Sequence, residues 1–318
     1  MNNTTVMSNQ ILLKPAIIIL DFILLFLLLH FLPYPLPITK ALSLLIFIAV
    51  LWLTEATHIT VTALLVPILA VFLGIFELQS ALSHFSNSTI FLFFGGFALA
   101  AALHKQKLDH LLASKIILLA KGRLFTAVLM LFVISAFISM WISNTATVAM
   151  MLPLAIGMAD HLDPEQDRNS ITFILLGVAY SASIGGIGTL VGSPPNVIAA
   201  AQTGLSFIQW MRIGMPIVLI LLPIAIVILF FFFKPKLERR YTPEKITFNW
   251  TINSKLTLAI FLCTVIAWIG SLPLSNLLGG IAQFDTLIAL IAAVLICLTG
   301  VASWRDIEQQ TEWGVLML

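Results

Sequence analysis

Long apolar runs separated by short polar connections recur along the whole chain. A membrane-spanning helix needs about 20 mostly apolar residues, and these runs approach that length: 16–32, 38–53, 59–76, 88–103, 213–233, 256–274 and 284–301. Charged residues make up only 9% of the sequence, whereas soluble domains carry roughly 25%. We therefore predict an all-α polytopic membrane protein with little soluble domain.

The sequence argues against an enzyme and against a nucleic-acid-binding protein. It shows no Ser/His/Asp, Cys/His or metal-ligand constellation. The net charge is only +2, and no run of Lys and Arg is dense enough to bind nucleic acid. Cys263 and Cys297 lie in apolar runs without CxxC or Cys/His spacing, so we interpret both as small core residues rather than a disulfide or metal pair.

Two polar or irregular segments interrupt the apolar sequence. Ser143-Asn144-Thr145 lies inside the stretch 124–157, and a glycine-rich segment, 184–196, ends in Pro-Pro-Asn. Non-helical backbone at membrane depth is tolerated only where protein buries it or where it lines a cavity. Polar residues that bond across helices, or simple packing kinks, also explain either break alone. Because the two occur in neighbouring segments, we predict a binding site at the centre of a transporter.

The segment 124–160 is predicted to be a re-entrant hairpin, since both of its ends are hydrophilic. Two full crossings would instead expose Ser143-Asn144-Thr145 as the only turn in water. The segment 170–209 is predicted to be one broken transport helix with an unwound middle. With the N-terminus in the cytoplasm, every Lys and Arg except Lys40 and Arg212 then falls on the cytoplasmic side, as the positive-inside rule requires.

The remaining segments complete the predicted topology. Residues 1–103 form scaffold-like membrane helices, 104–123 a cytoplasmic surface helix (or an ordinary loop helix), 210–234 a membrane helix and 235–255 a cytoplasmic loop. Residues 284–318 repeat the order of residues 59–93, an apolar span, a polar connector and a new apolar start. We therefore predict an inverted-repeat transporter fold, in which 256–318 begins a second repeat that is incomplete.

The chemistry of the two breaks favours an anion bound together with a cation. Neither 124–157 nor 170–209 contains Lys, Arg or His, so neutral groups and helix N-termini must hold an anion. Each helix end contributes about 0.3–2 kcal/mol, whereas burying a carboxylate costs several kcal/mol. A co-bound Na⁺ offsets that cost, and oxygen ligands without a carboxylate cage suit it better than a divalent metal. We expect no metal other than sodium.

These motifs resemble the divalent anion/sodium symporter family, which transports di- and tricarboxylates. The matching stretches are 143–153, which begins Ser-Asn-Thr, and Ser183-Ile184-Gly185-Gly186 through Pro194-Pro195-Asn196. The resemblance implies two sets of site residues. Ser139, Ser143, Asn144 and Gly192 would surround sodium, and Asn144, Thr145 and Ser193 would touch a substrate carboxylate. It also implies a homodimer with an elevator-like transport domain.

Family members carry a second Ser-Asn-Thr hairpin and a second Pro-Pro-Asn broken helix, and this sequence contains neither. We therefore expect the N-terminal portion of a transporter, which inserts into the bilayer but does not transport alone. The leading hypothesis is sodium-coupled symport of dicarboxylates such as succinate or malate across the cell (inner) membrane. The alternatives are a sodium-independent dicarboxylate exchanger and an inactive truncated membrane fragment.

Overall fold

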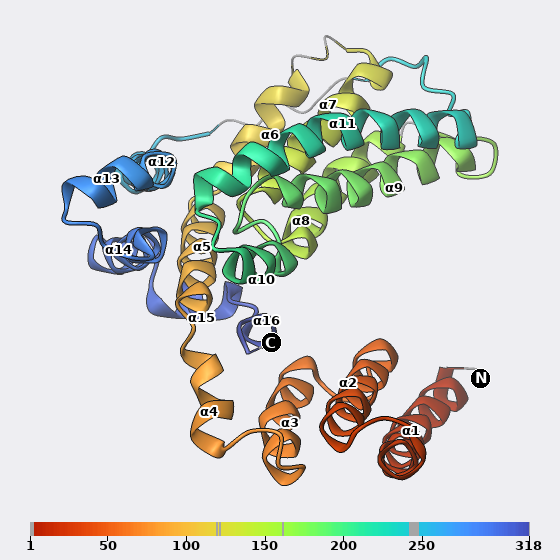
Figure 1. Cartoon of the computed structure of the whole chain (residues 1–318). Helices are drawn as coiled ribbons and strands as arrows, with labels where there is room; N and C mark the ends of the chain where they lie inside the picture. Colours follow the sequence, from red (N-terminus) through yellow and green to blue (C-terminus); the bar gives the residue numbers. More distant parts are fainter. Residues whose placement is uncertain (1–2, 119, 121, 161, 242–247, 318) are drawn as a thin grey trace. The chain divides into compact units, whose positions relative to one another are not determined.

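Helices connected by short turns make up the computed structural model, which describes residues 3–118, 120, 122–160, 162–241 and 248–317 (Figure 1). No strand occurs in these ranges. By length and composition, six of the described helical segments can cross a membrane: Leu13–Phe31, Leu36–Thr54, Leu78–Lys105, Arg168–Gly188, Phe207–Phe233 and Ile252–Ile269. The prediction of an all-α polytopic membrane protein is confirmed.

One compact unit comprises Met1–Ile90 together with Glu312–Leu318. Its elements are α1 (Asn3–Phe31), α2 (Leu36–Thr54), α3 (Ile59–Phe72), α4 (Leu78–Ser83), the 3-10 turn η1 (His84–Ser86) and α16 (Trp313–Leu316). Helices α1 and α2 pack against one another, with Leu25, Phe47 and Leu51 buried in a common cluster. Helix α16 packs on α3.

The second unit, Phe91–Thr311, holds both sequence breaks. Its elements are α5 (Ser88–Lys105), α6 (Leu108–Leu118), α7 (Leu124–Ser139), α8 (Asn144–Ala159), α9 (Arg168–Gly185), η2 (Gly186–Gly188), α10 (Pro194–Thr203), α11 (Phe207–Phe233), α12 (Ile252–Ile269), α13 (Ser271–Leu277), α14 (Phe284–Leu298) and α15 (Trp304–Gln310). Helix α7 is the centre of its core, because it packs on α6, α8 and α9. Leu131, Phe132 and Ile134 of α7 are completely buried.

The start of the segment 124–160 and the connection that follows the segment lie beside the basic stretch after α11. The Leu124 N–H donates to Arg239 O (3.1 Å), and the Tyr241 N–H donates to Gly122 O (2.9 Å). The Arg239 guanidinium also donates to Asp167, just before α9, at 2.8 Å. The start of α7, the start of α9 and the end of α11 therefore share one side of this unit. That this side is cytoplasmic stays a prediction, and residues 242–247 of the predicted loop lie outside the described residues.

Several predicted spans differ from the helices in the structure. Helix α1 already begins at Asn3 and continues through Pro15, and Gly270 divides the predicted span 256–274 into α12 and α13. The runs 59–76 and 284–301 yield helices of only 14 and 15 residues. Glycine explains part of the difference, because Gly74 and Gly300 adopt a left-handed conformation that ends a helix. Apolar runs thus locate these helices better than they locate their ends.

The prediction that Cys263 and Cys297 are core residues is wrong. Both are free and exposed, on α12 and α14 respectively. Large apolar side chains are exposed in the same way along α11, including Leu219, Ile220 and Ile228. A bilayer is as apolar as a protein core, so an apolar position in the sequence does not distinguish a core residue from a residue that faces lipid.

The two stretches that were compared as a repeat have the same order of elements. The first contains α3, the short α4 and then α5, and the second contains α14, the short α15 and then α16. The short helices α4 and α15 have 6 and 7 residues. The opposite orientation of the two stretches in the membrane stays a prediction.

The close packing of α7 on α9 generates a testable prediction. A methyl group on Gly177 of α9 would overlap the ring of Phe132, which is completely buried. Gly177→Ala should therefore lower the free energy of unfolding by about 1–3 kcal/mol, the usual cost of overpacking. Thermal unfolding in detergent would measure it. Adding Phe132→Leu should recover part of the loss.

Gly157→Ala is the matched control, because nothing lies within 4 Å of a methyl group at that position of α8. It should be neutral or stabilising by up to about 1 kcal/mol through helix propensity. Equal unfolding temperatures for the two alanine variants would contradict the close contact.

Candidate functional site

The polar triplet lies at the turn between α7 and α8. Helix α7 ends at Ser139, and α8 begins at Asn144. Ser143 is the N-cap residue of α8, and its hydroxyl accepts the N–H of Ala146 at 3.4 Å. Serine is favoured at this position because its side chain satisfies an amide that the helix leaves free. The triplet therefore starts a helix and does not interrupt one.

The second break separates α9 from α10. After the 3-10 turn η2 the chain is extended at Thr189, and α10 begins at Pro194. The Asn196 amide donates to Gly186 O (2.8 Å) and to Thr189 O (2.7 Å), and its side chain is buried. The Thr189 hydroxyl donates to Met140 O, next to the end of α7. Gly186 O and Thr189 O, two of the carbonyls released by the break, thus have partners within the protein.

Oxygen atoms from the two breaks converge. The Ser139 hydroxyl donates to Asn144 Oδ1 at 2.6 Å. A methyl group on Gly186 would lie 2.5 Å from Asn144 Oδ1 and 3.0 Å from Gly192 O. A methyl group on Gly192 would overlap Gly186 O and lie 2.9 Å from Ser139 O. We call these four residues, Ser139, Asn144, Gly186 and Gly192, the oxygen cluster.

The oxygen cluster lies where one helix ends and two helices begin. The last residue of α7, Ser139, brings its carbonyl there, and α8 and α10 begin beside it. Pro194 and Pro195 occupy the first turn of α10, so α10 lacks two of the N–H groups that a helix N-terminus normally presents. Amide donors for an anion therefore come mainly from α8, and α10 contributes its dipole and the Ser193 hydroxyl. Ser193 makes no capping hydrogen bond.

Comparison with known proteins identifies the family. A family profile described as "Citrate transporter" (CitMHS) matches residues 49–318. The chain belongs to the citrate transporter family. The resemblance to divalent anion/sodium symporters drawn from the two motifs is thereby confirmed at the level of the family.

Three relatives illustrate the range of similarity. A protein of Haemophilus influenzae named only as an uncharacterized transporter is 54% identical over 311 residues, covering 95% of this chain and 67% of that protein. The uncharacterized transporter MJ0672 of Methanocaldococcus jannaschii is 39% identical, covering 88% of this chain and 63% of that protein. The sodium-dependent dicarboxylate transporter SdcS of Staphylococcus aureus is 35% identical, covering 58% and 38%.

These comparisons bear on the class of protein. All three relatives are named as transporters, so the chain belongs among membrane carriers and not among enzymes. It spans about two thirds of the length of the first relative and less of the other two.

The structure brings some of the predicted site residues together and leaves others apart. Ser139, Asn144 and Gly192 meet in the oxygen cluster. Ser143 caps α8 beside it. Thr145 is exposed and Ser193 half-buried, and neither is hydrogen-bonded to the cluster in the described part of the chain. The assignment of sodium and substrate to these residues stays a prediction.

Three residues of this region were not predicted individually as site residues. They are Gly186, Thr189 and Asn196, and all three lay within the segment recognised as a break. The position of Asn196 directly after two prolines carried a usable signal. A side-chain amide there can replace backbone donors that proline lacks. Thr189 gave no comparable signal, because its partner is Met140, far away in the sequence.

Aromatic side chains and one carboxylate support the site from outside. The ring of Phe207, at the start of α11, stacks on Trp268 (centroids 4.7 Å apart) and lies near Trp141 of the α7–α8 turn (6.3 Å). Asp285, at the start of α14, accepts the N–H of Phe207 at 2.8 Å. The Trp210 indole donates to Ile187 O at 2.9 Å. The start of α11 is thus joined to both breaks and to α14.

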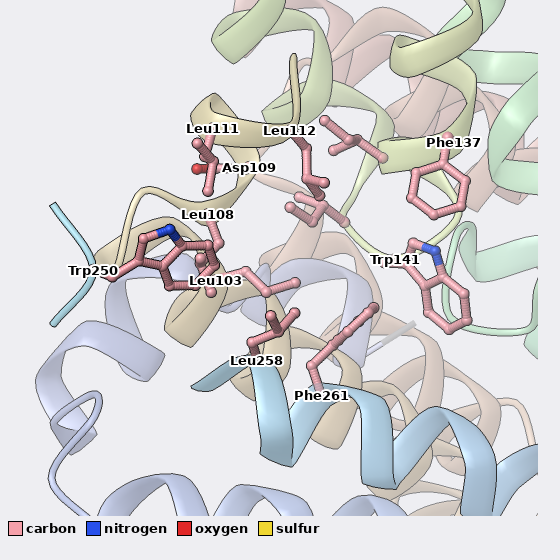
Figure 2. A pocket seen from close by; sticks show the side chains of 12 residues that line it. Leu103, Leu108, Asp109, Leu111, Leu112, Phe137, Trp141, Trp250, Leu258 and Phe261 are labelled. Carbon is pink, nitrogen blue, oxygen red and sulfur yellow. The ribbon is translucent and has the colours of Figure 1, made fainter. Parts of the chain in front are cut away.

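A small apolar cavity of about 80 Å³ lies beside the same turn. Figure 2 shows Phe137 and Trp141 on one side of it and Leu258 and Phe261 of α12 on another. Asp109 reaches its edge, but its carboxylate is engaged by hydrogen bonds. Because the apolar lining offers no partner to a carboxylate, this cavity is not a candidate anion site.

The Asn196 bridge leads to a prediction about stability. Asn196→Leu keeps a side chain of similar size but leaves Gly186 O and Thr189 O without this donor. Each unpaired buried acceptor costs about 1–3 kcal/mol, so the unfolding temperature in detergent should fall clearly. Gln202→Leu, an exposed position on the same helix, is the control and should change it little. A larger effect at Gln202 than at Asn196 would refute the bridging role.

Proposed function

We propose that this chain supplies the sodium site and part of the substrate site of a sodium-coupled dicarboxylate symporter, with succinate or malate as typical substrates. The observation that carries the proposal is a convergence of neutral oxygen atoms, the oxygen cluster, in two segments without any Lys, Arg or His. The proposal is also supported by a relative that is named as a sodium-dependent dicarboxylate transporter.

Sodium is the cation that best fits the cluster. Its candidate ligands are one amide oxygen, one hydroxyl and the backbone carbonyls of Ser139, Gly186 and Gly192, and no carboxylate is among them. Divalent Ca²⁺ and Mg²⁺ usually require carboxylate ligands, whereas unwound carbonyls and helix C-terminal ends coordinate Na⁺ in membrane carriers. Ser143, as the cap of α8, completes the proposed sodium set.

The substrate carboxylate is proposed to bind on the open side of the cluster. Asn144 and Thr145 form the first turn of α8, and Ser193 precedes α10. We propose that their hydroxyl, amide and backbone donors act on the carboxylate together with the positive dipole ends of the two helices. Without a cationic side chain, these donors are too weak to desolvate a dianion alone. Asn144 belongs to both sets, so sodium and substrate would strengthen each other's binding.

The two alternative functions, a sodium-independent exchanger and an inactive fragment, require different groups at the site. A sodium-independent exchanger needs another positive charge near the anion, and neither break contains one. An inactive fragment would not need the oxygen cluster at all. We further propose a location in the cell (inner) membrane with a cytoplasmic N-terminus, and a homodimer, as the family resemblance implies.

Sodium binding can be tested without transport. Na⁺ should raise the unfolding temperature of the protein in detergent, and K⁺ at equal ionic strength should not, because only a specifically bound ion stabilises by mass action. Ser139→Ala and Asn144→Ala should each require roughly five- to hundredfold more Na⁺, equivalent to about 1–3 kcal/mol. Ser183→Ala, at an exposed position of α9, is the control. Equal stabilisation by Na⁺ and K⁺ would refute the sodium site.

Transport separates the three hypotheses. With the protein as the cell makes it, reconstituted in liposomes, an inward Na⁺ gradient should drive accumulation of radiolabelled succinate, and a choline gradient should not. Asn144→Ala should weaken both succinate affinity and sodium dependence. Exchange of labelled for unlabelled succinate without Na⁺ would favour the exchanger, and an absence of both activities would favour the inactive fragment.

A further inference from the structure

A second cluster of potential ligands lies at the corner between α5 and α6, away from the oxygen cluster. His104 is in the last turn of α5, and Asp109 and His110 are in the first turn of α6. Lys107 between them adopts a left-handed conformation (φ 54°), which turns the chain back on itself. As a result, one ligand atom from each of the three residues lies within 4.8 Å of the others.

The carboxylate of this corner is held in a fixed position. The Asp109 side chain is only 1% exposed, and its Oδ2 lies 2.9 Å from His104 Nδ1. Its other oxygen accepts the backbone N–H of His110 at 2.7 Å. The His104 side chain is 49% exposed, so the corner is buried on one side and open to an arriving ion on the other.

The ring of His110 is the member of the cluster that packing does not explain. In the part of the chain that the structure describes, this ring contacts the His104 ring (centroids 6.2 Å apart) and makes no hydrogen bond. Two imidazoles and one carboxylate therefore meet, with one imidazole available for a new bond.

The cationic side chain next to His104 in the sequence is already engaged. Lys105 forms an ion pair with Asp306 of α15 at 2.8 Å. Hydrogen bonds from Lys105 and then Ser303 lower the pKa of Asp306 to about 2, so this partner is ionised at neutral pH. Gln106 donates to Val301 O at 2.8 Å. The corner is thus fixed to the α14–α15 region, and the charge of Lys105 is held by a carboxylate.

We propose that His104, Asp109 and His110 bind a transition-metal ion of the Zn²⁺ class. Imidazole and carboxylate are usual ligands of Zn²⁺, Co²⁺ and Ni²⁺. With metal–ligand bonds of about 2.0–2.1 Å, tetrahedral ligand atoms lie roughly 3.3 Å apart. The His104–Asp109 pair is already close to that separation, and a rotation of the His110 ring brings in the third ligand. Water fills the open position.

The residue spacing explains why this cluster was not predicted from the sequence. Positions 104, 109 and 110 do not share one face of a continuous helix, where residues three or four apart are neighbours. Only the turn at Lys107 brings them together. The expectation that the chain binds no metal other than sodium is therefore revised by this proposal.

Cobalt titration of the purified protein tests the proposal. The protein carries an affinity tag without histidine and is first treated with a chelator. Co²⁺ should bind saturably at one ion per chain, with the visible absorption of cobalt in a nitrogen and oxygen site, and excess Zn²⁺ should displace it. Binding should also raise the unfolding temperature.

Two variants make the test specific. His110→Gln retains the His104–Asp109 hydrogen bond and should weaken Co²⁺ binding at least about tenfold, the lower range for loss of even an outer-shell partner. His30→Gln, an exposed histidine on α1, should bind as the unchanged protein does. Non-saturable binding, or unchanged affinity in His110→Gln, would overturn the proposal. Because His110→Gln removes no hydrogen bond of its ring, its folding can be verified by an unchanged unfolding temperature without metal.

Discussion

In a bilayer, backbone N–H and C=O groups that a broken helix leaves unpaired cannot hydrogen-bond to water, so they need partners within the protein. The region around residues 186–196 supplies such partners. The Asn196 amide bonds two of the released carbonyls, and the Trp210 indole bonds a third, Ile187 O. Thr189 in turn satisfies Met140 O beyond the end of α7. The Trp210 and Thr189 bonds join the second break to α11 and to the α7–α8 turn. These hydrogen bonds therefore hold the unwound segment in one conformation, which an ion site requires.

The same constraint explains why the proposed site is neutral. A charged side chain would be costly at membrane depth, whereas hydroxyl, amide and carbonyl oxygens lose less when they are buried in pairs. The hydrogen bond from Ser139 to Asn144 Oδ1 is one such pair. Burying a site of this kind costs little free energy when the site is empty, and the site then offers only partial charges. It gains a full positive charge only when a cation arrives, so that affinity for an anion depends on the cation.

The sequence predicted the positions of the breaks but not the contacts that support them. Ser143-Asn144-Thr145 and Pro194-Pro195-Asn196 differ in composition from their apolar surroundings, so the sequence reveals both positions. The partners of Thr189 and Asp285 lie 49 and 78 residues away, and no local pattern records such distances. The burial of Cys263 and Cys297 was misjudged for a different reason, since lipid and protein core select the same side chains. The corner at Lys107 was missed because a single left-handed residue decides it.

The position of Asp285 limits how this unit can move. Its carboxylate accepts the N–H of Phe207, and its carbonyl accepts the indole N–H of Trp268. If α14 slid away from α11, the N–H of Phe207, a completely buried residue at the start of α11, would lose its acceptor. The starts of α11 and α14 are thus linked mechanically, and α12 is linked with them through Trp268. A displacement of the unwound segment would therefore move α11, α12 and α14 together.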